Sequence, residues 1–244
     1  MITKQKIVSL MDLTQLGDND TNEDIVKLCA KARNSLGEVA AICVFKEFIH
    51  VVKEQLGQDF KVATVVNFPA GDKSIKEILV ETQKALDLGA DEIDLVIDYK
   101  DYLDNGSSEK SVKMMSEVKK LCKDKALKVI IESGELASTD LIAKVSQDAI
   151  DAGTDFIKTS TGKTPIGATP EAAKVILETI AKNNKNIGFK ASGGIRNYQQ
   201  AVEYIELADN ILSSNFVTPK NFRFGVSGLL DNLLNQEQEH RHDY

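Results

Sequence analysis

A short glycine motif recurs along this chain at a constant spacing. The pattern Gly-x-Asp, followed by apolar residues, begins at Gly57, Gly89 and Gly153, so that 32 residues separate the first pair and 64 the second. Glycine readily adopts the left-handed conformation that ends a helix before the chain enters the next strand. The motif therefore predicts helix-to-strand junctions at a period of 32 residues, and a chain of 244 residues has room for about eight such units.

Short apolar runs rich in β-branched residues alternate with helical stretches. Several runs are apolar on consecutive positions, which is typical of parallel strands covered on both faces. Helix starts are indicated at Thr21, Thr139 and Thr169, the last with a proline at the first helical position. We predict strands at Ile7–Leu10, Val39–Val44, Lys61–Val66, Glu92–Ile97, Leu127–Glu132, Phe156–Thr159, Ile187–Ala191 and Asn210–Ser213.

Eight strand–helix units with right-handed crossovers predict an α/β fold, the TIM or (β/α)₈ barrel. We expect a single domain over residues 1–234, followed by a polar and mobile C-terminal tail over residues 235–244. A doubly wound open sheet is the alternative fold. It is disfavoured because no Gly-x-Gly-x-x-Gly turn follows the first predicted strand.

Composition narrows the classes of partner. The chain has 30 basic and 37 acidic residues, a net charge of −7, which disfavours binding to nucleic acid by general electrostatics. The longest apolar run, Val39 to Phe45, is too short to cross a membrane. Three cysteines and no secretory leader predict reduced thiols and a cytoplasmic location. A small phosphorylated ligand remains compatible, since backbone N–H groups can bind phosphate inside an acidic protein.

Histidine is almost absent from the body of the chain. His50 is placed in a predicted helix, and His240 and His242 are near the C-terminus. Neither the histidines nor the cysteines have the spacing of a metal site, so we expect no metal and no cofactor. Acid–base and nucleophilic chemistry would have to use lysine, a carboxylate, cysteine or a hydroxyl.

Two lysines stand out because they lie in apolar strands. Lys158 ends the run Phe156-Ile-Lys, and Lys190 lies in Gly188-Phe-Lys-Ala-Ser-Gly-Gly. The carboxyl ends of barrel strands are where active sites form. Lys158 is a candidate Schiff-base residue, whose pKa a neighbouring Lys190 and apolar surroundings would lower. The alternative is a structural ion pair with a barrel aspartate.

Other polar residues lie in or after predicted strands. Asp94 is either a counter-charge to the lysines or a proton shuttle, and these two roles are compatible. Asp12 is either an acceptor for a substrate hydroxyl or part of a salt bridge at the barrel rim. Cys43 is more typical of apolar packing than of a nucleophile. Three further candidates at strand ends are Thr14, Asn67 and Glu132.

Glycine-rich segments follow the last three strands of the expected barrel. Gly193-Gly194 follows the seventh predicted strand, and the segment Phe224-Gly-Val-Ser227-Gly228 follows the eighth. Many barrels bind phosphate in these two loops, through backbone N–H groups and a helix N-terminus. Thr161-Gly162-Lys163, after the sixth strand, would add a cation.

The ordered set of these segments resembles 2-deoxyribose-5-phosphate aldolases, a family of class I (Schiff-base) aldolases. The matching segments are Met11-Asp-Leu-Thr-Gln-Leu, Ala40-Ala-Ile-Cys-Val, Ala63-Thr-Val-Val-Asn-Phe-Pro, Gly89-Ala-Asp-Glu-Ile-Asp-Leu-Val, Leu127-Lys-Val-Ile-Ile-Glu-Ser-Gly-Glu-Leu, Phe156-Ile-Lys-Thr-Ser-Thr-Gly-Lys, Gly188-Phe-Lys-Ala-Ser-Gly-Gly-Ile-Arg and Arg223-Phe-Gly-Val-Ser. Two positions depart from some members. Ala191-Ser192 stands where those members have Pro-Ala, and Gly228 stands where they have a second serine.

The resemblance implies reversible, metal-free cleavage of 2-deoxy-D-ribose 5-phosphate into acetaldehyde and D-glyceraldehyde 3-phosphate. Lys158 would form the imine, Lys190 would lower its pKa, and Asp94 would relay protons through water. Tyr244, the last residue, would assist proton transfer at the donor carbon. The implied substrate-binding residues are Asp12, Thr14, Cys43, Thr161, Gly162, Lys163, Gly193, Gly194 and Ser227.

Two other functions remain compatible with the motifs alone. A metal-free isomerase for a phosphorylated sugar would keep the phosphate loops but form no imine. A non-catalytic barrel that senses such sugars would bind ligand without turnover. The expected partner in each case is a small phosphorylated sugar, with a homodimer possible.

Overall fold

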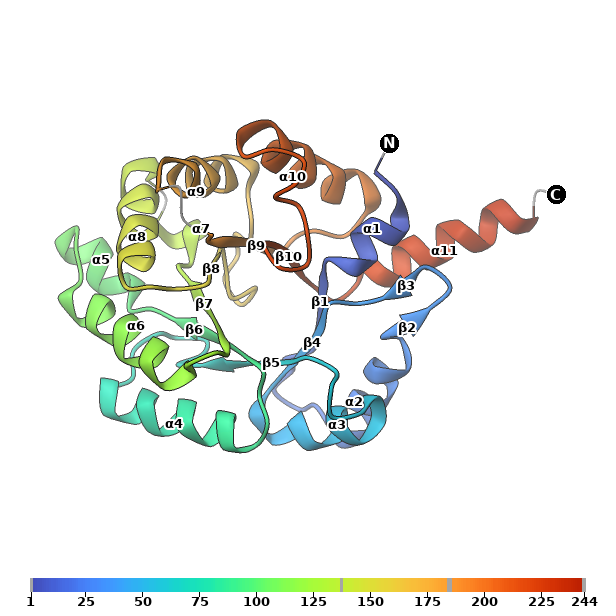
Figure 1. The fold of residues 1–244 in the computed structure, drawn as a ribbon, viewed down its shortest axis with the longest axis horizontal. Helices are drawn as coiled ribbons and strands as arrows, with labels where there is room; N and C mark the ends of the chain where they lie inside the picture. The colour runs from blue at the N-terminus through green and yellow to red at the C-terminus, as the bar shows by residue number, and fades with distance from the viewer. Residues whose placement is uncertain (1, 137, 184–185, 243–244) are drawn as a thin grey trace.

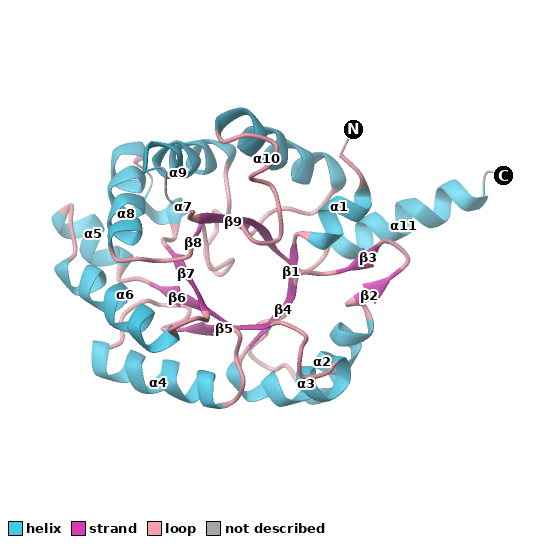
Figure 2. Cartoon of the chain, in the orientation of Figure 1, coloured by secondary structure: helices cyan, strands magenta, loops and turns pink. Residues whose placement is uncertain are grey.

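The computed structural model describes residues 2–136, 138–183 and 186–242, with side chains described as far as residue 236. Eight parallel strands close into a barrel in the order β1-β10-β9-β8-β7-β6-β5-β4 (Figures 1 and 2). The predicted TIM barrel is therefore confirmed. The barrel strands are β1 (Met11–Thr14), β4 (Ala41–Val44), β5 (Val62–Val66), β6 (Glu92–Val96), β7 (Ala126–Ile130), β8 (Phe156–Lys158), β9 (Gly188–Ser192) and β10 (Phe222–Val226).

Helices surround the barrel on its outside (Figure 2). A small antiparallel hairpin, β2 (Arg33–Asn34) and β3 (Gly37–Glu38), lies outside the closed sheet. The helices are α1 (Lys4–Ser9), α2 (Asn22–Ala30), the 3₁₀ turn η1 (Lys46–Phe48), α3 (Ile49–Leu56), α4 (Ile75–Asp87), α5 (Tyr99–Asn105), α6 (Glu109–Cys122), α7 (Ser133–Leu136), α8 (Thr139–Asp151), α9 (Pro170–Asn183), α10 (Tyr198–Ile211) and α11 (Leu229–His242).

The repeated glycines lie where the period placed them. Gly57, Gly89 and Gly153 follow α3, α4 and α8, and their φ angles of 96°, 98° and 86° are in the region that favours glycine. The barrel strands β5, β6 and β8 begin a few residues later. The glycine motif thus marks three of the helix-to-strand junctions of the barrel.

The aspartate of the motif has its own structural role. Asp91 accepts a hydrogen bond from the backbone N–H of Val62 at 3.0 Å and donates its own N–H to the carbonyl of Val62 at 2.8 Å. Asp155 makes the same pair of bonds to Leu127, at 2.8 and 3.0 Å. Each aspartate therefore joins the start of its strand to the neighbouring strand. A lysine on a preceding helix pairs with each carboxylate.

The first predicted strand was wrong. Ile7 and Val8 belong to helix α1, which Thr3 caps by accepting a hydrogen bond from the backbone of Lys6, and the barrel strand begins at Met11. Ile7 and Val8 are buried because α1 packs its apolar side against the core. The apolar run was continuous across the helix and the strand, so periodicity alone did not separate them.

The last predicted strand was also wrong. Residues 210 and 211 end α10, whose buried side chains include Tyr204, Ile205 and Ala208 at helical spacing. The eighth barrel strand is Phe222–Val226. Arg223 and Gly225 interrupt its apolar character, and this is why the strand signal was weak.

The helix starts were correct at Thr21 and Thr169, whose hydroxyls accept backbone N–H groups of the first turn. The third helix, α8, begins at Thr139 as predicted, and Ser138 is its N-cap. Residues 235–242 continue α11, which extends outward past the edge of the barrel (Figure 1). Within the described part of the chain, no helix combines the length and apolar character needed to cross a membrane.

Candidate active site

A network of buried charges fills the inside of the barrel. Four cations and three carboxylates take part, and each residue is at most 3% exposed. They come from six strands, of which β6 supplies two side chains and β1, β7, β8, β9 and β10 supply one each. The members are Asp12, Glu92, Asp94, Lys128, Lys158, Lys190 and Arg223.

Arg223 holds two carboxylates at one end of the network. Its guanidinium donates to Asp12 and, at 2.9 Å, to Oε1 of Glu92. Lys128 contacts the other oxygen of Glu92 at 2.6 Å and lies 3.4 Å from Asp12. Buried charges of this kind are tolerated only when they are paired and hydrogen-bonded, as these are.

Asp94 joins three ammonium groups. Its Oδ1 is 2.9 Å from Nζ of Lys128, and its Oδ2 is 2.8 Å from Nζ of both Lys158 and Lys190. Lys158 and Lys190 are register partners on neighbouring strands β8 and β9. The two lysines that the sequence singled out are therefore side by side, with the predicted aspartate between them.

Among the described residues, the network has four cations and three carboxylates, so one cation is in excess. The pKa shifts identify the lysine that is least able to remain protonated. Burial lowers the pKa of Lys158, and the attraction of Asp94 only partly opposes this, while the charge of Lys190 lowers it further. The pKa values of Lys190 and Lys128 are raised, because nearby carboxylates outweigh their burial. Lys158 is thus the network member most readily available as a neutral amine.

The two aspartates of the network remain ionised. Burial raises the pKa of Asp94, but the charges of Lys128, Lys158 and Lys190 outweigh it and hold that pKa well below its usual range. The pKa of Asp12 is lowered in the same way by Lys128, Lys190 and Arg223. A carboxylate with so low a pKa is a weak base, which favours the counter-charge role of Asp94 over direct proton abstraction.

Three other predicted residues lie in or directly after the barrel strands. Cys43 is fully buried on β4, and burial raises the pKa of its thiol, as expected for a residue that packs and does not attack. Thr14 donates its hydroxyl to the carbonyl of Asp12 at 2.8 Å. Asn67, directly after β5, donates to the carbonyl of Val96 and accepts the N–H of Lys73.

A cavity of about 900 Å³ opens at the carboxyl ends of the strands, and Lys158 is on its wall. Its wall is formed by the predicted segments of the loops after β8, β9 and β10, together with the end of β1. The predicted residues that line it are Thr14, Thr161, Gly162, Lys163, Gly193, Gly194 and Ser227. Asp12, Cys43, Asp94 and Lys190 are buried inside the barrel and do not line the cavity.

The glycines of these loops allow the backbones of neighbouring loops to come close to each other. Gly162, Gly193 and Gly194 have φ angles of 78°, 83° and 85°. A Cβ on Gly167 would lie 2.6 Å from the backbone of Gly193, so the loop after β8 touches the loop after β9. Ser227 shortly precedes the N-terminal end of α11, where unpaired N–H groups favour an anion.

Three members of the network were absent from the predicted site: Glu92, Lys128 and Arg223. The signal was present, because Lys128 and Arg223 lie inside apolar strand sequences in the same way as Lys158. Arg223 was obscured by the misplaced eighth strand. Tyr244 lies outside the described residues.

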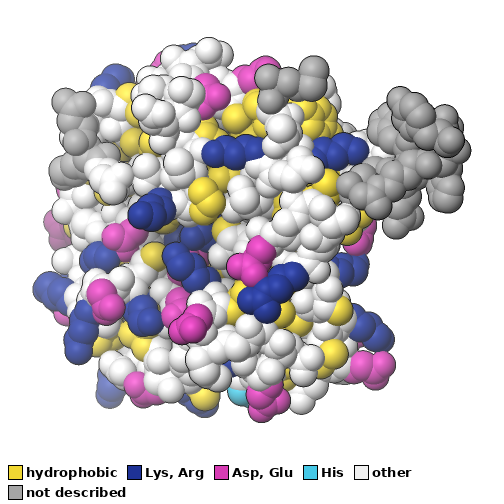
Figure 3. All heavy atoms as spheres, turned by 45° about the vertical axis from the view of Figure 1, so that its right-hand side comes forward, with side chains coloured by type: hydrophobic (Ala, Val, Ile, Leu, Met, Phe, Trp, Pro, Cys, Tyr) yellow, Lys and Arg dark blue, Asp and Glu magenta, His cyan; other side chains and the backbone are white. Residues whose placement is uncertain are grey.

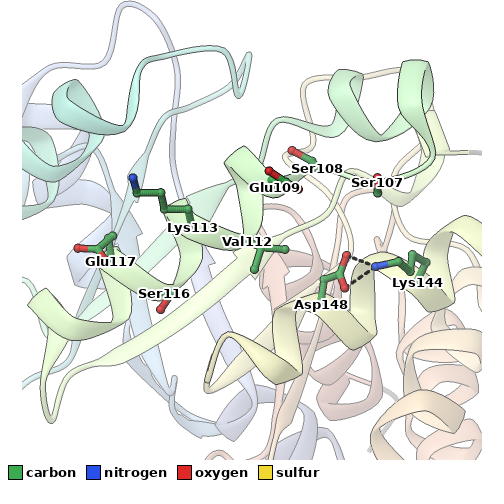
Figure 4. Close-up of a pocket in the computed structure, with 9 residues that line it drawn as sticks. All are labelled: Ser107, Ser108, Glu109, Val112, Lys113, Ser116, Glu117, Lys144 and Asp148. Atoms are coloured by element: carbon green, nitrogen blue, oxygen red, sulfur yellow. Dashed lines mark hydrogen bonds and ion pairs between the residues drawn. The ribbon is translucent and has the colours of Figure 1, made fainter.

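A second hollow, of about 540 Å³, lies on the outside of the barrel against α6 and α8 (Figure 4). Lys144 and Asp148 form an ion pair on its wall, and none of the predicted site residues lines it. Acidic and basic side chains are intermixed on the face of the molecule that Figure 3 shows. The cavity at the strand ends is therefore the candidate active site.

A closed parallel barrel with a buried lysine of lowered pKa on the wall of a cavity at the strand ends is an arrangement suited to amine catalysis. Residues 6–226 match the family described as DeoC/LacD family aldolase. The chain belongs to this family and is an aldolase, a carbon–carbon lyase.

Solved structures agree with the assignment. A candidate deoxyribose-phosphate aldolase from Coccidioides immitis is 27% identical, with a TM-score of 0.83 over 96% of this chain and 86% of that one. A deoxyribose phosphate aldolase from Aeropyrum pernix, described as a tetramer, is 25% identical, with a TM-score of 0.79 over 98% and 93%. A candidate enzyme of the same kind from Toxoplasma gondii, 24% identical with a TM-score of 0.87 over 98% and 94%, shares the fold.

Proposed function

We propose that this aldolase cleaves 2-deoxy-D-ribose 5-phosphate reversibly into D-glyceraldehyde 3-phosphate and acetaldehyde, through an imine on Lys158. The observation that carries the proposal is the buried amine of Lys158, with its lowered pKa, 2.8 Å from Asp94 and on the wall of the cavity. The names of the relatives from Coccidioides immitis and Aeropyrum pernix support the choice of substrate.

The proposed reaction begins with the open-chain sugar. Neutral Lys158 attacks the C1 aldehyde to form a carbinolamine, which loses water to give a protonated imine. The C3 hydroxyl then loses its proton, and the C2–C3 bond breaks as its electron pair moves into the imine. Glyceraldehyde 3-phosphate leaves, and the remaining enamine is protonated at C2. Water hydrolyses the resulting imine, which releases acetaldehyde and the free lysine.

Lys190 and Asp94 have complementary tasks in this scheme. Lys190 keeps its proton because Asp12 and Asp94 raise its pKa, so it stays a positive charge beside Lys158 and disfavours a second ammonium group. Asp94 orients both amines through one oxygen. Lys158 is the only one of these three residues on the cavity wall. Protons exchanged through water between the substrate and Lys158, Lys190 or Asp94 would therefore pass at Lys158.

The phosphate would lie where the loops after β8, β9 and β10 meet. Gly193, Gly194 and Ser227 offer backbone N–H groups there, and Lys163 adds a flexible ammonium group that is 3.6 Å from Asp18 and one-third exposed. Gly228 leaves a backbone N–H and no hydroxyl at the start of α11. In this proposal the sugar binds with its aldehyde at Lys158 and its phosphate at the rim of the cavity.

Borohydride trapping tests the proposal. Protein incubated with acetaldehyde and borohydride should gain one ethyl group per chain, mapped by peptide mass spectrometry to Lys158. Untreated protein should release glyceraldehyde 3-phosphate from deoxyribose 5-phosphate. Lys158→Met should lose both properties, whereas Lys120→Met, on the exposed face of α6, should keep both. An adduct on another lysine contradicts the assignment. Substrate binding without adduct or cleavage would favour an isomerase or a sensor.

A further inference from the structure

Glu132 is a buried carboxylate that the proposed reaction leaves unused. It is fully buried two residues after the end of β7, yet it is not among the residues that line the cavity. No cation of the described chain lies within salt-bridge distance of it, and burial raises its pKa. Burying a carboxylate without a counter-charge costs free energy of folding. The hydrogen bonds of Glu132 therefore indicate what the side chain does.

Within the described residues, the side-chain hydrogen bonds of Glu132 all go to the loop between β8 and α9. Its oxygens accept the backbone N–H of Thr161 at 3.3 Å and the hydroxyl of Thr161 at 2.5 Å. They also accept the hydroxyl of Thr164 at 3.2 Å. The hydroxyl oxygen of Thr161 in turn accepts the backbone N–H of Lys163 at 3.0 Å. A continuous chain of bonds thus runs from Glu132 to Lys163.

The backbone of Glu132 supports the same conclusion. Its φ of 51° is in the left-handed region, which strains a residue with a Cβ and which glycine adopts freely. A non-glycine residue kept in this conformation at the mouth of a barrel indicates that its side chain is needed. The carboxylate of Glu132 reaches Thr161 from this conformation.

An ionised carboxylate suits this task better than an amide does. It can only accept hydrogen bonds, so both threonine hydroxyls must donate to it, and the lone pairs of Thr161 are left for Lys163. A glutamine could accept one of these bonds, but its NH₂ group would compete as a donor to the hydroxyls. Glycines 134 and 167 anchor the far part of the loop through close backbone contacts to Ile166 and Gly193.

We propose that Glu132 is a positioning residue that presents the Thr161-Gly162-Lys163 segment to the phosphate of the substrate, and so sets the preference of this aldolase for phosphorylated over unphosphorylated sugars. It acts through Thr161 and does not touch substrate. The inference rests on the proposed function, since it assumes that a phosphorylated sugar occupies the cavity.

The test compares two substrates, 2-deoxyribose 5-phosphate and 2-deoxyribose. Glu132→Gly removes the carboxylate and also relieves the left-handed backbone, so the variant should fold. We expect its KM for the phosphorylated sugar to rise roughly tenfold or more, as for the loss of hydrogen bonds to a charged group. Its kcat/KM for 2-deoxyribose should change by no more than roughly twofold, because that substrate has no phosphate to position. The KM of Glu132→Gln should lie between those of Glu132→Gly and the wild type.

Glu117→Gln is the matched control, because Glu117 pairs with Lys120 on the outside of α6, and it should leave both substrates unaffected. Equal losses on both substrates in Glu132→Gly, with the fold intact by circular dichroism, would show a merely structural role and overturn the proposal. An unchanged preference would overturn it as well. A wild-type protein that forms the acetaldehyde adduct but shows no preference for the phosphorylated sugar would refute this inference alone, whereas no adduct would refute the proposed function first.

Discussion

At the scale of single residues, the site depends on how many charges are enclosed together. Lys128, Lys190 and Arg223 are each matched by a carboxylate, and the fourth cation, Lys158, is the one in surplus. Burial then disfavours its charged form more than Asp94 favours it. The chemical difference between Lys158 and Lys190 therefore arises from the set of charged partners, because both are lysines that are almost fully buried.

Replacing Lys190 should change the pH dependence of the reaction. Lys190→Leu removes a positive charge that lowers the pKa of Lys158 and frees Asp94 to attract Lys158 more strongly, and both effects raise that pKa. A smaller neutral fraction at pH 7 follows. We expect the rate of adduct formation with acetaldehyde to fall by more than roughly tenfold at pH 7 and by much less at about pH 9, because the neutral fraction of an amine well below its pKa falls as that pKa rises.

The measurement is the full pH–rate profile of single-turnover adduct formation. Lys120→Leu, at an exposed site on α6, serves as the control and should reproduce the wild-type profile. A loss of the same size at every pH would mean that Lys190 acts on something other than the protonation of Lys158.

At the scale of elements, the candidate active site is formed by loops that meet across the mouth of the barrel. The loop after β8 is tied to the end of β7 through Glu132 and to the end of β9 through the N–H of Ala168, which donates to the carbonyl of Ser192 at 2.9 Å. Gly167 allows a close approach to Gly193 in the next loop. In the proposed reaction the strands supply the amine of Lys158, and the loop contacts would decide where a phosphate can bind.

Gly167→Ala should separate binding from folding. Its Cβ would lie 2.6 Å from the backbone of Gly193, so the two phosphate loops must move apart. We expect the KM for deoxyribose 5-phosphate to rise several-fold, measured by steady-state kinetics, with a loss of stability of about 1–3 kcal/mol as for other overpacked sites.

Gly106→Ala is the matched control for this substitution. Gly106 has a φ of 71° but open space around its Cβ position, at the end of α5 and away from the cavity. It should lower stability by about 1 kcal/mol through backbone strain while the KM stays at the wild-type value. An unchanged KM in Gly167→Ala would show that the loop contact is irrelevant to binding.

At the scale of the whole molecule, the charged interior links folding to pH. Asp12 and Asp94 have folded pKa values below those of the unfolded chain, so the folded state binds fewer protons than the unfolded state in acid. Their contribution to the free energy of unfolding is fully present above the unfolded value, about pH 4, and is lost as pH falls through the folded values. Lys128 and Lys190, whose pKa values are raised, lose theirs only above about pH 10.

Urea unfolding should therefore show a midpoint that falls steeply below about pH 4. Because the responsible ion pairs are buried, the fall should persist in high salt, which screens the surface pairs such as Lys27–Glu23. Circular dichroism at several pH values, in low and in high salt, measures this. A midpoint that stays constant from about pH 5 to about pH 3, or a fall that high salt abolishes, would be inconsistent with control by the interior network.

Much of the architecture was accessible from local pattern. The 32-residue glycine period, the consecutive apolar strands and the threonine caps depend on short-range chemistry, and they led to the barrel and to six of its eight strands. The two wrong strands show the limit of periodicity. Helix α1 runs directly into β1 without a polar break. Arg223 makes the β10 sequence look unlike a buried strand. Its charge is paired with Asp12 and Glu92, and local pattern cannot show this because both are far away in the chain.

The sequence by itself determined the fold class, the aldolase family and the two lysines, since each is encoded in contiguous motifs. Only the tertiary structure decided that Lys128, Glu92 and Arg223 complete the charge network and that Lys158 is the basic residue in excess. It also decided that Glu132 reaches the loop of Lys163. The physical reason is that electrostatic and hydrogen-bond energies depend on distance in space. Asp94 and Lys190 are 96 positions apart in the chain and 2.8 Å apart in the barrel.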